Sequence, residues 1–231
     1  MKESAPPKAT ALGIFAGLWS SYDPVLEYVT LLQDRRWKNW VIGNLAVRND
    51  ATVLDVGCGT CVLEERMSGD VSVIGVDLTE GMIRTGQKKR IPLVTSLLRS
   101  DGERLPFKAS SFDAVVSCYV VKYCSPDLLV SEMARVLKPG GKLVVYDFAR
   151  PRGLLWPFNA LYVYGVLRII GESLELVRLK VSTTFTELPG IIARSAWDEG
   201  FRETLIRAGL TPKVEKVLPG GVAIGFVAEK S

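Results

Sequence analysis

The segment Val53–Thr60, VLDVGCGT, decides the fold of this 231-residue chain. An apolar run leads into a turn with glycines at 57 and 59, and a helix is expected over Val62–Met67. Glycines in such a turn let the backbone approach a ligand and direct amide N–H groups toward it. The spacing is not the G-x-G-x-x-G pattern of dinucleotide-binding turns, and Asp55 before the turn suits a ligand ammonium better than a pyrophosphate.

Short apolar runs alternate with helical segments along the rest of the chain. Continuous Val/Ile/Leu runs between helices of about a dozen residues are typical of βαβ units, whose parallel sheet is covered on both faces. The last two runs are joined by Pro219-Gly220-Gly221, which predicts an antiparallel pair. Strands are expected at 52–56, 71–76, 94–98, 112–118, 142–148, 211–218 and 222–229, and helices at 24–47 (one or two), 80–89 and from Ser125-Pro126 onward.

The same patterns predict the domain organisation. We expect a flexible tail at 1–20 and a single domain at 21–231, with a helical cap at 21–50 and an apolar insertion at 151–196. Within the insertion, 154–170 reads LLWPFNALYVYGVLRII, which at 17 residues is short for a membrane span and is interrupted by Pro157, Asn159 and Arg168. Two interpretations stay open: a buried lid over an acceptor site, or an entrance that faces a membrane.

The composition excludes several kinds of chemistry. The chain has no histidine, which rules out Ser-His and Cys-His catalysis and histidine-ligated metals. Its net charge of +4 comes without a long basic run, so no nucleic-acid partner is expected. The N-terminus lacks a signal pattern, which favours a cytoplasmic protein.

Three acidic residues lie at or just after the ends of the first three expected strands: Asp55, Asp77 and Asp101. An acid at the end of the second strand can accept both hydroxyls of a ribose. Together with the glycine turn, the three acids favour a ligand with an amine, a ribose and an adenine-type ring but no phosphate. S-adenosylmethionine has these features, and the alternative is that the glycines and Asp77 serve only the turn.

Five segments in order resemble the motifs of class I S-adenosylmethionine-dependent methyltransferases: VLDVGCGT, VIGVDLTEGMI, SDGERLPF, SFDAVVS and ARVLKPGGKLVVYDF, over Val53–Phe148. The resemblance implies a Rossmann-like, seven-stranded, mostly parallel α/β sheet with an antiparallel terminal strand, helices on both faces and an N-terminal helical cap. A narrower resemblance, to the ubiquinone/menaquinone C-methyltransferases, rests on Tyr22-Asp23, Arg36-Trp37-Lys38, residues 146–151 and residues 219–223. The cofactor contacts expected are Tyr22, Asp55, Gly57, Gly59, Thr60, Asp77, Leu78, Asp101, Gly102 and Cys118.

The segment after the fourth strand departs from that family. Where the family has F-G-x-R-N, this chain has Tyr119-Val120-Val121-Lys122-Tyr123, in the segment that lines the acceptor pocket of the family. We take Lys122 as the candidate for stabilising a developing phenolate and Tyr119 and Tyr123 as residues that shape the pocket. The alternative for Lys122 is a solvated residue at a helix entry. Cys61 replaces the third motif glycine and is expected to fit only if the first helix lies further from the sheet.

The function favoured is C-methylation of a demethylmenaquinol-type ring or another hydrophobic small molecule. Alternatives are methylation of a different acceptor, such as a lipid amine head group, and a non-catalytic S-adenosylmethionine-binding protein. The expected partners are the hydrophobic acceptor, a peripheral contact at the inner face of the membrane and a second copy of the chain.

Four cysteines are expected at one edge of the sheet: Cys58, Cys61, Cys118 and Cys124. The C-x-x-C spacing of the first two is compatible with redox or metal chemistry. We prefer the simpler interpretation, in which they are small buried apolar side chains, and we predict no metal.

Overall fold

The structure is a computed structural model that describes residues 8, 12–13, 15, 19–151, 156–176 and 182–231. Most of the expected tail at 1–20 and the start of the insertion lie outside these residues. The domain boundaries inferred from the sequence therefore stay predictions.

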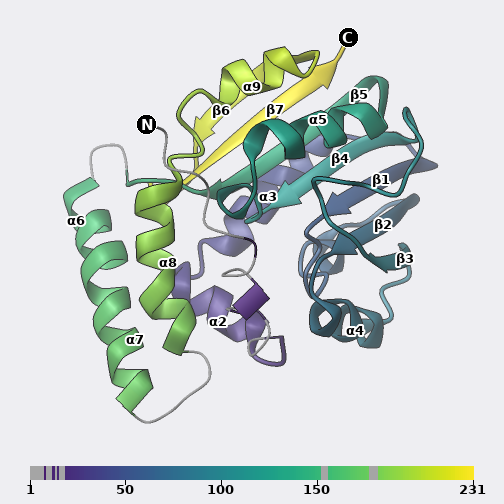
Figure 1. The fold of residues 1–231 in the computed structure, drawn as a ribbon. Coiled ribbons are helices and arrows are strands. Elements are labelled where there is room, and N and C mark those ends of the chain that lie inside the picture. Colours follow the sequence, from purple (N-terminus) through teal and green to yellow (C-terminus); the bar gives the residue numbers. More distant parts are fainter. Residues whose placement is uncertain (1–7, 9–11, 14, 16–18, 152–155, 177–181) are drawn as a thin grey trace.

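The core is a seven-stranded sheet in the order β3-β2-β1-β4-β5-β7-β6. Its first five members in that order are parallel, whereas β7 pairs antiparallel with both β5 and β6, as the terminal pair in the sequence predicts (Figure 1). The strands are β1 (Ala51–Val56), β2 (Val71–Asp77), β3 (Val94–Arg99), β4 (Phe112–Cys118), β5 (Leu137–Phe148), β6 (Leu210–Val217) and β7 (Ala223–Lys230). The expected α/β class, the seven-stranded, mostly parallel sheet and the antiparallel terminal strand are confirmed.

Helices cover both faces of the sheet, each over its own apolar cluster. Leu129 and Met133 of α5 pack with Phe201 of α9 and Phe226 on one face. Trp37 of α3 packs with Tyr146 on the other. These covering helices are α2 (Tyr22–Val29), α3 (Asp34–Leu45), α4 (Glu80–Lys89), α5 (Pro126–Val136) and α9 (Phe201–Arg207). The expected helical stretch at 24–47 is thus a pair, α2 and α3.

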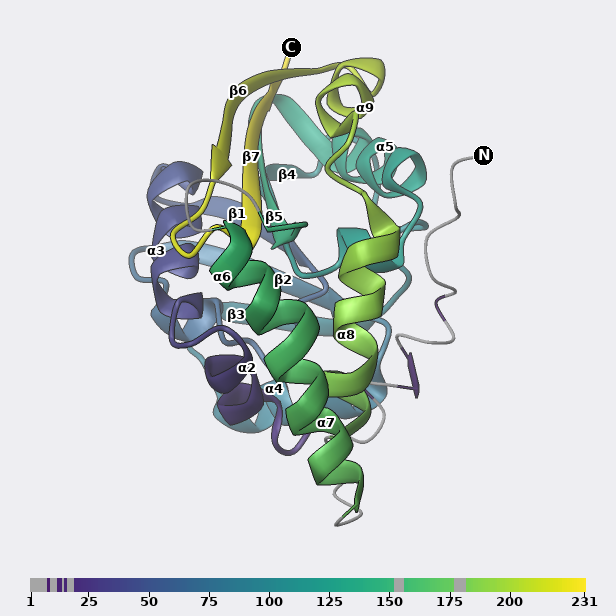
Figure 2. The same cartoon turned by 90° about the vertical axis from the view of Figure 1, so that its left-hand side faces the viewer.

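The insertion forms a separate helical layer beside α2. It consists of α6 (Trp156–Ala160), a π-helical turn η3 (Leu161–Val166), α7 (Leu167–Leu176) and α8 (Ser182–Ser195). Figure 2 looks onto this layer, with α6 and α7 outermost and α8 beside them. Val163, Leu167, Leu188 and Ile192 join the apolar cluster of the sheet face that α3 covers. In the described part of the chain no helix combines the length and apolarity that a membrane span needs.

The prediction of a helix over 62–67 is wrong. The chain turns after the glycine loop and forms only one 3₁₀ turn, η1 (Glu64–Arg66), before β2 begins at Val71. Cys61 adopts a left-handed conformation with φ of 64°, which a residue inside an α-helix does not have. The expected condition for Cys61, a displaced first helix, therefore does not arise. Its buried thiol instead lies against Gly86 of α4, where a side chain would collide with it.

Candidate active site

One pocket lies at the carboxyl ends of β1, β2 and β4, the edge where parallel sheets bind ligands. It contains most of the residues singled out from the sequence, which come from segments far apart along the chain. Of the ten expected cofactor contacts, the pocket is lined by Tyr22, Gly57, Gly59, Asp77, Leu78, Asp101, Gly102 and Cys118, and by the two expected acceptor-site residues Tyr119 and Tyr123.

The glycine loop forms the floor of this pocket. Gly57 and Gly59 have φ of 82° and 55°, a region that favours glycine. The amides of Gly57 and Cys58 both donate to the Val76 carbonyl, at 2.7 and 3.0 Å, which fixes the turn against β2. A Cβ on Gly57 would lie 2.1 Å from Cγ2 of Val120. Glycine is therefore required here both by backbone conformation and by space.

Two acidic side chains border the same pocket in different environments. Asp77 accepts from the backbone amides of Gly59 at 3.0 Å and Thr79 at 2.7 Å. Burial raises the pKa of Asp77, and these amide hydrogen bonds offset part of that rise. Burial acts in the same direction on Asp101, but the ammonium of Lys8, 2.5 Å away, and the amide of Glu103 outweigh it and lower the pKa.

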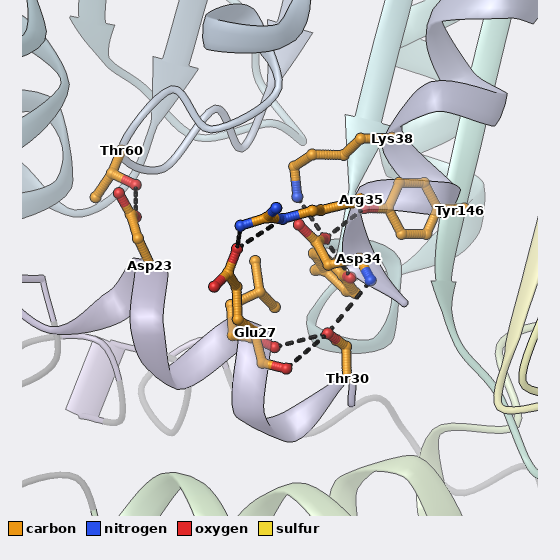
Figure 3. Close-up of polar contacts among 10 residues, drawn as sticks. Asp23, Glu27, Thr30, Asp34, Arg35, Lys38, Thr60 and Tyr146 are labelled. Carbon is orange, nitrogen blue, oxygen red and sulfur yellow. Dashed lines mark hydrogen bonds and ion pairs between the residues drawn. The ribbon is translucent and has the colours of Figure 1, made fainter. Parts of the chain in front are cut away.

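The other two expected cofactor contacts, Asp55 and Thr60, do not line the pocket. The Thr60 hydroxyl donates to Asp23 at 2.5 Å, which ties the loop to the start of α2 (Figure 3). Asp55 is 2% exposed and faces Glu64 beneath the loop. A direct role in cofactor contact stays a prediction for both residues.

The pocket fits S-adenosylmethionine by its chemistry. The glycine loop leaves space next to backbone groups, and the Asp77 and Asp101 carboxylates can accept hydroxyl and amine protons. Leu78 and Met82 supply apolar contact for a flat ring. These residues of the chain would hold the cofactor.

Residues near the N-terminus also line the pocket, which the sequence interpretation missed. Lys8, Leu12 and Phe15 belong to the segment expected to be a loose tail. Lys8 forms ion pairs with Asp101 and Glu103, and the Phe15 ring packs edge-on against Tyr22 and Tyr123 at centroid distances of 6.1 and 5.6 Å. No local motif in residues 1–20 indicates these contacts, because their partners lie elsewhere in the sequence.

A second, smaller cavity adjoins the cofactor pocket and is mostly aromatic and aliphatic. The two share Phe15, Tyr22, Tyr119 and Tyr123 as walls. We call this second cavity the acceptor chamber, after the role that the sequence predicts for Tyr119, Lys122 and Tyr123; its lining is Phe15, Tyr22, Val25, Leu26, Val29, Tyr119, Lys122, Tyr123, Phe148 and Leu188. The N-terminal cap and the insertion both contribute, through α2 and Leu188 of α8.

Tyr119 stands between the two cavities in an unusual conformation. It follows β4 with φ of 65°, which is uncommon for a bulky residue and marks a strained position. Its hydroxyl donates to Oδ1 of Asp34 at 2.7 Å. The ammonium groups of Lys38 and Lys122 lie 5.4 and 5.5 Å from its ring centroid. Burial, with the nearby Asp34 charge, holds the pKa of Tyr119 well above its usual range.

Asp34 is the centre of a buried polar cluster that the sequence interpretation missed. Its Oδ1 accepts from Lys38 at 2.5 Å and from Tyr146 at 3.3 Å as well as from Tyr119, while Thr30 accepts from its backbone amide (Figure 3). The partners of Asp34 on β5 and after β4 are 112 and 85 positions away. Only the i, i+4 spacing of Asp34 and Lys38 is visible in the sequence.

Lys122 is buried, in contrast to a solvated helix-entry residue. Its ammonium is 2.7 Å from Oδ1 of Asp147 and donates to the Tyr119 carbonyl at 2.6 Å. It also lies 4.4 Å from the Tyr123 ring centroid. Burial lowers the pKa of Lys122, and the Asp147 charge opposes that effect. Lys122 therefore holds the strained Tyr119 backbone while it borders the acceptor chamber.

The four cysteines are free thiols. Cys118 and Cys124 line the cofactor pocket, while Cys58 and Cys61 pack behind the loop with Ile83. Among the residues that the structure describes, no three cysteine or acidic side chains are grouped to hold a metal ion. The packing of Cys58 and Cys61 agrees with small buried apolar side chains.

Comparisons with known proteins agree with this geometry. Residues 54–145 match a family described as "Methyltransferase domain". The demethylmenaquinone methyltransferase of Paenarthrobacter aurescens is 30% identical over 223 residues, which cover 94% of this chain and 85% of that protein. The enzyme of the same name from Beutenbergia cavernae is 36% identical over 153 residues, covering 65% of this chain and 62% of that protein.

The fold is also shared with solved structures. A chain of the complex between the Haloferax volcanii Trm112 methyltransferase activator and a methyltransferase superposes with a TM-score of 0.65. The match covers 93% of this chain and 96% of that chain, at 17% identity. At this identity the likeness concerns the fold alone.

Proposed function

Because the chain belongs to the class I S-adenosylmethionine-dependent methyltransferases, we propose that it transfers a methyl group to a ring carbon of a quinol that carries a hydrophobic tail. The observation that carries this proposal is the acceptor chamber, which shares aromatic walls with the cofactor pocket. Tyr119, Tyr123 and Phe148 line the chamber with aromatic rings, which favours an acceptor that is itself a flat ring. The names of the relatives, demethylmenaquinone methyltransferases, support the same class of acceptor.

The mechanism rests on orientation and on the release of one proton, because the ring carbon that gains the methyl group gives up its hydrogen as a proton to water. Bound S-adenosylmethionine supplies an electrophilic methyl group on a positively charged sulfur. The shared walls hold the acceptor ring next to the cofactor pocket, and such orientation accounts for much of the acceleration in two-substrate reactions.

Tyr119 is suited to receive the acceptor's hydroxyl. The hydroxyl of Tyr119 has a single proton, which it donates to Asp34. An acceptor O–H that reaches the Tyr119 oxygen would therefore meet a lone pair, and Tyr119 would accept its hydrogen bond. That hydrogen bond raises electron density on the ring that attacks the methyl group. Lys122 borders the chamber, where its charge favours negative charge developing on the acceptor oxygen, and Tyr123 completes the wall.

The proposal includes a membrane contact through an exposed apolar surface. We define the outer apolar face as Tyr28, Leu31, Leu32, Trp156, Phe158, Leu161, Val166, Ile169 and Ile170, each more than a third exposed. The Tyr162 hydroxyl donates to the Tyr28 carbonyl at 3.1 Å, which joins the α2 end to η3. Leu31 and Leu32 have φ of 49° and 62°, so a strained turn presents two leucines to solvent.

A lipid bilayer is the occupant to which we commit for this face. Arg35 and Arg36 follow the two leucines and are exposed; Arg35 is paired with Glu27, and the charge of Arg36, which contacts the neutral Gln33, suits an anionic lipid surface. The α2 helix that ends in this face also lines the acceptor chamber through Leu26 and Val29. An acceptor tail that leaves the chamber along α2 would therefore reach the bilayer.

Transfer of labelled methyl groups tests the acceptor. Purified protein is incubated with labelled S-adenosylmethionine and, separately, a reduced demethylmenaquinone, its oxidised form and vesicles containing phosphatidylethanolamine. We expect label in the reduced quinone only, because the oxidised ring lacks the hydroxyl that Tyr119 would bind. Label in the phospholipid would replace the proposal by head-group methylation.

Vesicle flotation tests the membrane contact. We expect the wild type to float with anionic vesicles and the variant Leu31→Ser/Leu32→Ser to stay in the dense fraction. The matched control is Leu128→Ser, an exposed leucine on α5, outside the outer apolar face. Equal flotation of all three proteins would contradict a contact through this face.

A further inference from the structure

Two buried carboxyl groups lie behind the glycine loop without ordinary partners. Asp55 at the end of β1 is 2% exposed and Glu64 of η1 is fully buried. Oδ1 of Asp55 and both carboxyl oxygens of Glu64 find no hydrogen-bond donor among the described residues. Buried acids are normally hydrogen-bonded, and each exception calls for an explanation. The two carboxyl groups face each other, so one proton held between them would satisfy both.

The surrounding charges do not neutralise this pair. Lys38 of α3 and Lys89 of α4 favour its ionised form, but Lys38 is paired with Asp34 and Lys89 with Asp23 and Glu65. The other titratable groups that face the pair are the thiols of the loop and of β4: Cys58, Cys61 and Cys118. A negative charge on the pair therefore has no cation of its own.

The buried environment favours the protonated form of the pair. Burial is the main cause that raises the pKa of Asp55 well above its ordinary value and the pKa of Glu64 to about 7. Two like charges this close also disfavour double ionisation. The number of protons on the pair is therefore sensitive to a charge that arrives nearby.

Two connections link the pair to the cofactor pocket, one along the chain and one through Cys118. Asp55 is two residues before Gly57, which lines the pocket, and Cys118 both lines the pocket and interacts electrostatically with Asp55 and Glu64. S-adenosylmethionine carries a sulfonium, an ammonium and a carboxylate, a net charge of one positive unit. Its product, S-adenosylhomocysteine, lacks the sulfonium charge and is neutral.

We propose that Asp55 and Glu64 form a proton-sharing pair whose protonation responds to the charge of the ligand in the cofactor pocket. The pair thereby favours binding of S-adenosylmethionine over S-adenosylhomocysteine. A positive ligand stabilises the ionised pair, whose proton then passes to solvent. With the neutral product in the pocket, the pair takes a proton back from solvent. The inference depends on the cofactor alone and is independent of the acceptor.

The sign of the pH dependence follows from this exchange. Binding that releases a proton strengthens as pH rises through the range in which the free protein is still protonated. We therefore expect the affinity for S-adenosylmethionine relative to S-adenosylhomocysteine to rise between pH 6 and 8. If about half a proton is released at pH 7, the ratio rises about threefold per pH unit there.

Calorimetric titration in buffers of different ionisation heat measures directly how many protons are released when a ligand binds. The test compares Glu64→Gln with Glu65→Gln, which removes a neighbouring acid that is exposed and paired with Lys89. Comparing variants cancels protons that belong to the ligands themselves. We expect wild type and Glu65→Gln to release about half a proton more with S-adenosylmethionine than with S-adenosylhomocysteine at pH 7, and Glu64→Gln to lose that excess. The same excess in Glu64→Gln would overturn the proposal.

A measurement on the wild type keeps the test decisive if Glu64→Gln fails to fold. The affinities for both ligands are measured from pH 6 to pH 8. The ammonium of S-adenosylmethionine loses its proton as pH rises, so ligand deprotonation alone would weaken its binding. A rising affinity ratio therefore supports the protein pair, and a flat or falling ratio overturns it.

Discussion

The cofactor pocket and the acceptor chamber share walls but are built in different ways. The pocket depends on a tight turn and on acids at strand ends, such as Gly57 and Asp77, whose partners are mainly backbone groups. The chamber depends on side chains from five separate segments of the chain, and its one charged lining residue, Lys122, is paired with Asp147 in the interior. The difference predicts that damage to the pocket removes cofactor binding, whereas damage to the chamber leaves it intact and removes transfer.

Gly57→Ala should have the largest effect. A Cβ here would lie 2.1 Å from Val120 Cγ2, and the positive φ adds strain of about 1–2 kcal/mol for alanine. We expect affinity for S-adenosylmethionine to fall about 100-fold or more, as measured by calorimetry. Gly43→Ala in α3, where a Cβ meets no atom within 4 Å, is the control and should bind normally. Normal binding by Gly57→Ala would show that the loop is adaptable.

Lys122→Met should cost the most stability. It leaves Asp147 buried without its cation, a change that typically lowers the free energy of unfolding by about 3–5 kcal/mol. Chemical denaturation measures the loss. The double variant Lys122→Met/Asp147→Asn removes both charges and should recover most of it. If the double variant is stable but still transfers slowly, Lys122 also acts on the acceptor. If the single variant is as stable as wild type, the Lys122–Asp147 ion pair does not contribute to stability.

Tyr119→Phe should lower the rate of methyl transfer while leaving cofactor binding intact. It removes the oxygen that we expect to receive the acceptor hydroxyl, so kcat should fall about 100-fold. Affinity for S-adenosylmethionine should stay within about twofold, because Asp77 and the glycine loop are unchanged. Tyr146→Phe is the matched control, since Tyr146 also donates to Asp34 but lines neither cavity. Equal kcat for the two variants would contradict a specific role of Tyr119.

Glu64→Gln should have the smallest of these effects, a change in the pH dependence of the free energy of unfolding. Because burial raises the pKa of Glu64 from 4.5 to about 7, the folded wild type binds more protons than the unfolded chain between these values. The free energy of unfolding therefore falls by on the order of 2–3 kcal/mol as pH rises through this window. Above the window it levels off. The variant should lose less stability between pH 5 and pH 8 in denaturant titrations. Parallel curves for both proteins would contradict an acid buried in this way.

The sequence was sufficient wherever structure depends on neighbouring residues. The apolar run and turn residues at 112–118 and 80–89 predict β4 and α4 with their observed bounds. The glycine turn and the strand-end acids predict four residues that line the cofactor pocket, Gly57, Gly59, Asp77 and Asp101, and the family resemblance adds Tyr22, Leu78, Gly102 and Cys118.

Prediction failed where distant contacts override local pattern. The left-handed conformation of Cys61 and its packing against Gly86 prevent the helix expected at 62–67. No local propensity in the sequence indicates this conformation. Asp34 and Tyr119 meet only because α3 crosses the end of β4. Lys8 joins the pocket for the same kind of reason.

Carbon-13 NMR of the reaction product tests the central claim most directly. The wild type is given S-adenosylmethionine labelled in its methyl carbon together with a reduced demethylmenaquinone. We predict one enriched signal in the range of aryl methyl carbons, and a signal about 100-fold weaker when Tyr119→Phe is used over the same period. An enriched signal in the range of methoxy or N-methyl carbons would contradict transfer to a ring carbon.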